Sequence, residues 1–200
     1  MAGEKKIWNY LLRVLGFAVF LVLLILLAAS LILARPQKEK AEISSAQPYR
    51  EAGSSLSIDS ETDLFTLISE FPVPVMNFMS GSGMTFVSAV SADEAIPGGF
   101  ARVATLNWQT ADGQPMILRS ICPDTALSLL DGEYHFMPYA GPTLFGRSSV
   151  RMENDETIRL HVAKDGALYV VLLPRSLSGQ VSALCRSLQL YMPPVSRTDE

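Results

Sequence analysis

The longest apolar run of the chain extends from Val14 to Ala34 and contains twenty-one residues without a charged side chain. Fifteen of these residues are Leu, Ile, Val or Phe. At roughly 0.5 kcal/mol each, they favour insertion into a bilayer by about 7 kcal/mol. A helix of this length is about 31 Å long, which matches the hydrocarbon layer of a membrane. The run therefore predicts a transmembrane helix over residues 14–34 that contacts membrane lipid.

The residues around this run predict its orientation. Lys5, Lys6 and Arg13 precede it, and basic residues beside a span favour the cytoplasmic side. Basic residues also follow the span, but long domains translocate largely regardless of their charge. We therefore expect a single-pass protein of the cell membrane, with a short cytoplasmic tail over residues 1–13 and an extracytoplasmic C-terminal domain.

A cleaved signal peptide is the competing interpretation of the same run. Ala28, Ala29 and Ser30 form a weak small-residue cleavage site behind a basic start. The apolar run continues past this site to Ala34, beyond the usual length of a signal-peptide core. This continuation favours an uncleaved signal-anchor.

Residues 35–60 are rich in Ser, Ala, Pro and charged residues and have no apolar periodicity. They predict a flexible linker with a root-mean-square span of roughly 28 Å. A helix is expected to begin after Ser60, whose hydroxyl can cap the first turn, and to end at Pro72. Its apolar residues have helical spacing. They are Leu64, Phe65, Leu67, Ile68 and Phe71.

Beyond Gly83 the same order of elements occurs twice, with Asp112-Gly113 and Asp165-Gly166 at corresponding hairpin turns. We expect an α+β domain over 61–192, mostly antiparallel sheet with helices on one side, and the repeated order suggests a duplicated βββα unit. Residues 193–200 are expected to form a disordered tail. The predicted strands cover 84–90, 100–109, 115–121, 148–153, 157–163 and 167–174, and the predicted helices cover 124–130 and 178–190.

Apolar alternation indicates how the second half is buried. Ile158, Leu160 and Val162 alternate with Arg159 and His161, so we expect this strand to have one buried and one exposed face. The next strand has an unbroken apolar run and is expected to be central, with both faces covered.

Charge and motif content exclude several function classes. Residues 60–200 carry nine Lys or Arg against fifteen Asp or Glu, and an acidic domain repels phosphate backbones, so we expect no nucleic-acid partner. The only His and Cys residues are His135, His161, Cys122 and Cys185, whose spacing lacks the paired ligands of a zinc site. Serine-nucleophile and phosphate-loop motifs are also absent from the sequence. We therefore predict no catalytic residue, no metal and no cofactor.

The two cysteines allow two interpretations. Cys122 and Cys185 could form one disulfide, because an extracytoplasmic compartment is oxidising. They could also be two separate buried thiols, since Cys185 falls on the apolar stripe of the last predicted helix.

The segment between the two halves is the strongest binding candidate. Residues 134–146 read YHFMPYAGPTLFG and are too long and irregular for a tight connection. We predict Tyr139 and Phe145 as contacts to a ligand or partner. The alternative is that Tyr134, Phe136 and Phe145 fold back and seal the sheet.

Two stretches of the domain resemble a known family. They are VATLNWQTADGQPMIL and LHVAKDGALYVVLLPRSLSGQVSALCRSL, with Asp165-Gly166, Tyr169 and Ser187-Leu188 as matching positions. Residues 84–190 thereby resemble the extracytoplasmic C-terminal domain of unknown function found on anti-sigma-factor-like membrane proteins of Gram-positive bacteria. Because only thirteen residues precede the predicted span, the resemblance implies a bacterial surface sensing or binding domain and not sigma-factor binding.

The sequence thus predicts a membrane protein whose extracytoplasmic domain is a non-catalytic interaction or sensing module. Its partner would be an unidentified protein or envelope ligand, brought close by the membrane tether. Two alternatives stay open. One is a cell-envelope hydrolase with an active site assembled from scattered residues, and the other is a structural subunit of a membrane complex.

Overall fold

The computed structural model describes residues 47–130, 132–138 and 141–192 of the chain. The predicted cytoplasmic tail, the predicted span over 14–34, residues 35–46 of the predicted linker and the predicted tail over 193–200 lie outside these residues. Among the described residues, none of the helices has the length and apolar character needed to span a bilayer.

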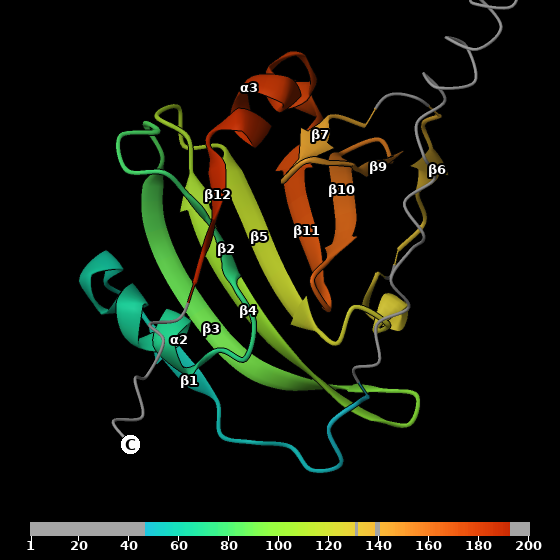
Figure 1. Cartoon of the computed structure of the whole chain (residues 1–200). Coiled ribbons are helices and arrows are strands. Elements are labelled where there is room, and N and C mark those ends of the chain that lie inside the picture. The colour runs from blue at the N-terminus through green and yellow to red at the C-terminus, as the bar shows by residue number, and fades with distance from the viewer. Residues whose placement is uncertain (1–46, 131, 139–140, 193–200) are drawn as a thin grey trace, which may run out of the picture. The chain divides into compact units, whose positions relative to one another are not determined.

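One sheet of eight strands forms the framework of the domain (Figure 1). Every neighbouring pair of its strands is antiparallel, and two short α-helices accompany it among the described residues, which confirms the predicted α+β class. In spatial order the strands are β1 (Leu56–Ile58), β3 (Thr85–Ile96), β4 (Gly99–Gln109), β5 (Pro115–Cys122), β11 (Ala167–Pro174), β10 (Thr157–Lys164), β9 (Val150–Glu153) and β6 (His135–Phe136).

Turn chemistry sets the hairpins of this sheet at the positions that the sequence predicts. Gly113 and Gly166 have φ angles of 74° and 77°, in the left-handed region that glycine adopts without strain. The hairpins β4–β5 and β10–β11 therefore form around Asp112-Gly113 and Asp165-Gly166. As predicted, β11 is a central strand that is buried on both faces.

The repeated order of elements holds for the strands but not for the helical segments. The strands β3, β4 and β5 and the strands β9, β10 and β11 form two meanders that meet where β5 pairs with β11. The 3₁₀ turn η2 (Leu127–Leu129) follows β5, and its neighbours pack on one face of the sheet. The helix α3 (Val181–Arg186) follows β11 and packs on the opposite face.

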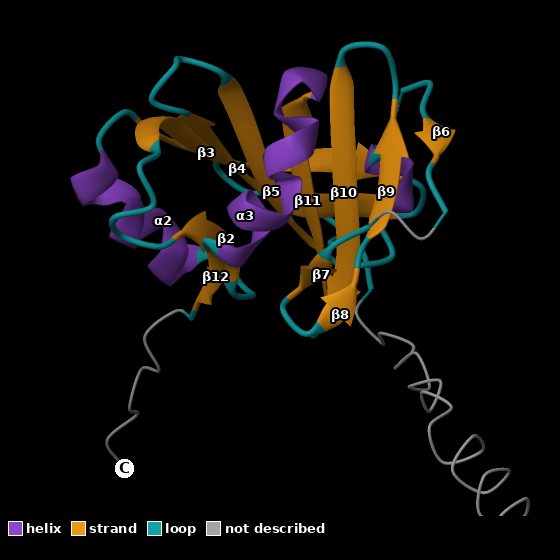
Figure 2. Ribbon diagram, turned by 90° about the horizontal axis from the view of Figure 1, so that it is seen from above, coloured by secondary structure: helices purple, strands orange, loops and turns teal. Residues whose placement is uncertain are grey.

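The main core lies on the face of the sheet that carries Leu106, Leu118 and Leu160, which we call the covered face. Figure 2 shows the covering elements gathered on this side, and their buried residues belong to one cluster. The covering elements are α2 (Leu64–Glu70), α3, and the ribbon formed by β2 (Val75–Phe78) and β12 (Leu188–Tyr191). The two α-helices thus lie on one side of the sheet. The helix predicted over 124–130 is instead the 3₁₀ turn η2, which packs on the opposite face, so the prediction that all helices lie on one side is wrong for this segment.

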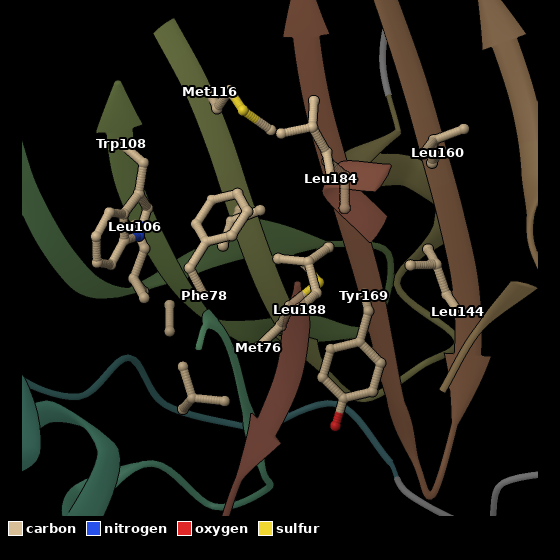
Figure 3. Packing of buried hydrophobic residues seen from close by; sticks show 14 of the residues in the cluster. Met76, Phe78, Leu106, Trp108, Met116, Leu144, Leu160, Tyr169, Leu184 and Leu188 are labelled. Carbon is tan, nitrogen blue, oxygen red and sulfur yellow. The ribbon is translucent and has the colours of Figure 1, made fainter. Parts of the chain in front are cut away.

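The β2–β12 ribbon closes the centre of the covered face. Met76 and Phe78 of β2 and Leu188 of β12 lie over the sheet beside Trp108 and Tyr169 (Figure 3). The Phe78 and Trp108 rings meet edge to face at a centroid distance of 5.5 Å. The Tyr169 hydroxyl is 3.0 Å from the carbonyl oxygen of Pro74 and donates a hydrogen bond to it. Apolar packing and a buried polar anchor thus hold the ribbon in place.

The C-terminal element differs from the prediction. The helix predicted over 178–190 is instead the 3₁₀ helix η3 (Arg175–Gln180) followed by α3, and α3 ends at Arg186. Ser187 terminates it, because its hydroxyl and its N–H both donate to the carbonyl of Leu184. Residues 188–191 then pair with β2, and their apolar–polar alternation suits a strand.

Near the N-terminal side, the predicted helix start is confirmed and one burial prediction is wrong. Ser60 caps η1 (Glu61–Asp63) by accepting a hydrogen bond from the Thr62 N–H, and α2 follows directly. Four of the five predicted apolar positions are buried, but the Phe65 side chain is 63% exposed, because it points away from the face that packs on the sheet.

The last part of the predicted linker belongs to the domain. Tyr49 exchanges two backbone hydrogen bonds of 2.9 Å with Phe100, and residues 56–58 form β1. The Arg102 guanidinium lies over the Tyr49 ring and binds the Asp93 carboxylate at 2.8 Å. This guanidinium lowers the pKa of Asp93, which also accepts a hydrogen bond from the Gly53 N–H. The chain is therefore tied to the β3–β4 hairpin from Tyr49 onward.

The buried centre of the sheet gives a direct stability prediction. Leu118 lies on β5, has no exposed surface, and faces the main core. Replacing it with Ala should lower the free energy of unfolding by about 2–5 kcal/mol through lost burial and the cavity left behind. Urea unfolding of the purified chain measures the difference. The control variant Leu127→Ala, at a side chain that is 58% exposed, should change stability by less than about 0.5 kcal/mol. Equal losses in the two variants would contradict the assigned core.

Candidate functional site

The face of the sheet opposite the covered face, which we call the outer face, is covered only in part. A small apolar cluster lies at one end of it, where Leu129 and Leu130 pack against β4, β5 and β11. Its buried members are Ala101, Val103, Ile121, Ala126, Leu168 and Val170. Beyond this cluster, Ile117 and Leu172 lie side by side on β5 and β11 and keep part of their surface exposed.

A cleft of about 200 Å³, which we call the outer cleft, opens beside this cluster. It brings together two arginines that lie far apart in the sequence. Arg119 on β5 is paired with Val170, and Arg159 on β10 is paired with Leu172. Because paired residues of antiparallel strands point to the same face, both arginines flank β11 on the outer face. The cleft is lined by Glu94, Arg119, Leu129, Leu130, Tyr134, Arg159, Val170 and Leu172.

Arg119 joins the sheet to the end of η2. Its Nη2 atom lies 2.6 Å from Oε1 of Glu94, and its Nη1 atom donates to the carbonyl of Leu129 at 3.3 Å. The Arg119 side chain is 17% exposed and that of Glu94 is 40% exposed. The ion pair therefore lies at the opening of the cleft, where its carboxylate remains in contact with water.

Arg159 forms the buried side of the cleft. Its Nη1 atom donates to the carbonyl of Leu130 at 2.8 Å, and its guanidinium carbon lies 4.2 Å from the centre of the Tyr134 ring. The residue is only 5% exposed, which differs from the prediction that this position faces water. The difference arises because Leu130 and Tyr134 contact this part of β10 on the outer face. The cation–π contact and the hydrogen bond stabilise the buried charge.

A second hollow of about 150 Å³ adjoins the outer cleft at Leu172, which lines both. It is mostly apolar and runs along β5 and β11 away from the arginines. Its lining residues are Pro115, Ile117, Glu156, Thr157, Leu172, Leu173 and Pro174. We refer to the cleft and the hollow together as the outer groove. The outer groove is cationic at one end and apolar at the other.

His161 lies beside the outer cleft on β10, between Val150 and Val170 of the neighbouring strands. Burial lowers the pKa of its imidazole, and the charge of Arg159 lowers it further. The ring is therefore neutral at pH 7. Its Nδ1 atom is buried and has no hydrogen-bond partner among the described residues.

The predicted contact residues fall in two places. Tyr139 lies outside the described residues. Phe145 has a φ angle of 51°, and its half-buried ring packs edge to face on Tyr169 at 5.4 Å. This packing is the sealing role that the sequence left as the alternative, and a ligand-contact role for Phe145 stays a prediction. Phe136, by contrast, is 60% exposed on the edge strand β6.

Both cysteines are free, buried thiols in the structure, which agrees with the second interpretation, and the alternative disulfide between Cys122 and Cys185 is not formed. Cys122 ends β5 with its Sγ atom 3.8 Å from the Tyr49 hydroxyl. Cys185 lies on the buried side of α3 and belongs to the main core, where burial raises its pKa to about 12. Within the described ranges, no group of three or more His, Cys, Asp or Glu side chains could hold a metal ion.

The sequence interpretation missed the two arginines of the outer cleft. The sequence contains a signal for one of them. Arg119 is a charged residue between Ile117 and Ile121, which lie on the same face of β5. That pattern indicates a charge beside a core, but it does not identify the second arginine, because Arg159 comes from the other meander.

The state of the thiols can be measured. We expect the folded chain at pH 8 to react slowly with a thiol reagent, because both sulfur atoms are buried and burial raises both pKa values. Unfolding in denaturant without reductant should expose two reactive thiols, and the variant Cys185→Ala should expose one. An unfolded chain without reactive thiols would contain the disulfide and contradict the structure.

The comparisons with known proteins leave the outer groove as the main guide to function. No protein-family model, no curated protein and no solved structure matches the chain.

Proposed function

We propose that the chain is a single-pass membrane protein whose extracytoplasmic domain is a non-catalytic interaction or sensing module. The outer groove is the observation that carries this proposal. One face of the sheet is closed by α2, α3 and the β2–β12 ribbon, whereas the outer face keeps a groove with charged and apolar ends. Such a combination of an apolar floor with few convergent polar groups suits a ligand or a partner side chain.

The chemistry of the outer cleft favours binding over proton transfer. Guanidinium groups keep their charge at any physiological pH, so Arg119, at the opening of the cleft, can attract an anionic group, and neither Arg119 nor Arg159 can act as acid or base. His161 titrates below its ordinary range, and it therefore adds no charge near neutral pH. A partner with one acidic group next to an apolar part fits this surface best.

The membrane location is supported by the apolar run over 14–34 and by its basic flank. A tether confines the domain to the vicinity of the membrane and raises its effective concentration for other envelope components. The resemblance of residues 84–190 to an extracytoplasmic bacterial domain agrees with this location.

The location is tested with reporters fused after Glu200. We expect alkaline phosphatase, which folds only outside the cytoplasm, to be active, and a cytoplasmic fluorescent reporter at the same position to be dark. The fusion should sediment with membranes after alkaline washing and retain its full length. The opposite reporter pattern, or a product shortened by about thirty residues as expected from signal-peptide cleavage, would contradict the anchored topology.

The binding surface is tested by photocrosslinking in living cells. A benzoylphenylalanine at position 172, in the outer groove, should give an adduct of defined mass. The same residue at position 65, on the exposed side of α2, serves as the control. The adduct at position 172 should decrease when Arg119→Gln is added. Identical adducts from both positions, or no effect of Arg119→Gln, would contradict a role for the groove.

A further inference from the structure

Glu94 indicates which chemical group the outer cleft accepts. Its carboxylate binds Arg119 at 2.6 Å, although 40% of the Glu94 side chain is exposed at the opening of the cleft. Solvent reaches the Glu94 side of this ion pair and weakens the attraction between the two charges. A carboxylate from a ligand can therefore replace Glu94 on the planar guanidinium, which is shaped to bind carboxylates.

The charge balance of the outer groove favours a single negative charge. Arg159 is buried, so Arg119 is the cation that a ligand can reach, and its charge is matched by Glu94. Glu156 is a second anionic residue of the groove. A ligand that exchanges with Glu94 charge for charge keeps this balance. A doubly charged phosphate would add repulsion from the two glutamates.

The apolar hollow indicates to which kind of molecule the ligand carboxylate is attached. It continues from Leu172 past Ile117 to Pro174, and its volume of about 150 Å³ corresponds to about five water molecules of liquid. Short aliphatic chains occupy space of this order, and their burial against Ile117 and Leu172 would release water from apolar surface. An unbranched chain also follows the direction of β11, along which the hollow runs.

We propose that the outer groove binds an aliphatic monocarboxylate, with the carboxylate on Arg119 and the hydrocarbon chain over Ile117 and Leu172. This inference rests on the proposed function and names the ligand class of the same site. In the bound state Glu94 swings into water, and the ligand carboxylate accepts hydrogen bonds from Arg119. Glu94 therefore competes with the ligand carboxylate for Arg119 and lowers the affinity of the site for the ligand.

The experiment uses the full-length chain in nanodiscs of zwitterionic lipid, with ¹³C-labelled isoleucine methyl groups, and hexanoate as the probe. Saturable shifts of the Ile117 methyl signal are expected. The Ile58 signal should not move, because this residue is buried in the main core. Hexan-1-ol and hexylamine, which lack the carboxylate, should bind at least tenfold more weakly.

Variants of the ion pair separate binding from a purely structural role. Glu94→Gln removes the competing charge and should raise the affinity for hexanoate several-fold. Arg119→Gln should lower it at least tenfold. The matched control Arg186→Gln, on the exposed side of α3, should leave it unchanged. An unchanged Ile58 signal identifies a variant as folded. If Arg119→Gln fails this criterion, the test uses the affinity of Glu94→Gln for hexanoate and the binding of hexan-1-ol and hexylamine to the unchanged chain.

Three results would overturn the inference. They are no saturable shift at Ile117, equal binding of hexanoate and hexan-1-ol, or no change of affinity in Glu94→Gln. Any of these together with a crosslink at position 172 that depends on Arg119 would refute the ligand class and leave the proposed function standing. Loss of that crosslink and of the reporter pattern would instead refute the proposed function itself.

Discussion

The pairing of β5 with β11 is the interaction on which the rest of the domain depends. Five residue pairs, from Ile121↔Leu168 to Ile117↔Leu172, join the two meanders into one sheet. Since β11 is buried on both faces, neither meander can bury its apolar residues without the other. The covered face then receives the β2–β12 ribbon and the two α-helices, whereas in the part of the chain that the structure describes the outer face receives η2 and its neighbours Ala126 and Leu130. The outer groove is the part of the sheet that this arrangement leaves open.

Local chemistry explains how much of the fold could be predicted. The hairpins at Asp112-Gly113 and Asp165-Gly166 each depend on two adjacent residues, so they could be predicted from the sequence. The central position of β11 could also be predicted, because it depends on one apolar run. The strands β2 and β12 were not predicted, because four residues are too few to distinguish a strand from a continuing helix or a loop. Their pairing is long-range, because β2 precedes β3 in the chain and β12 follows β11.

The candidate site was harder to predict from the sequence, because it also depends on contacts between residues that are far apart in the chain. Arg159 was expected to face water because its strand alternates, yet its guanidinium is buried against the Tyr134 ring and donates to the Leu130 carbonyl. The arrangement of Glu94, Arg119 and Arg159 depends on strand order, which residue periodicity does not give. The aromatic segment was recognised, but its visible roles are to pack on Tyr169 through Phe145 and on Arg159 through Tyr134.

Hydrogen exchange of the backbone amides tests most directly the claim that β5 and β11 join two interdependent halves. The amides of residues 168–173 should exchange only through global unfolding, at the same free energy as the slowest amides of β4 and β10. Residues of both meanders should then lose protection together as denaturant is added. Exchange of β9 and β10 at a much lower free energy than β3 and β4, with β11 following only one of them, would show that each meander is stable without the other and would contradict this account.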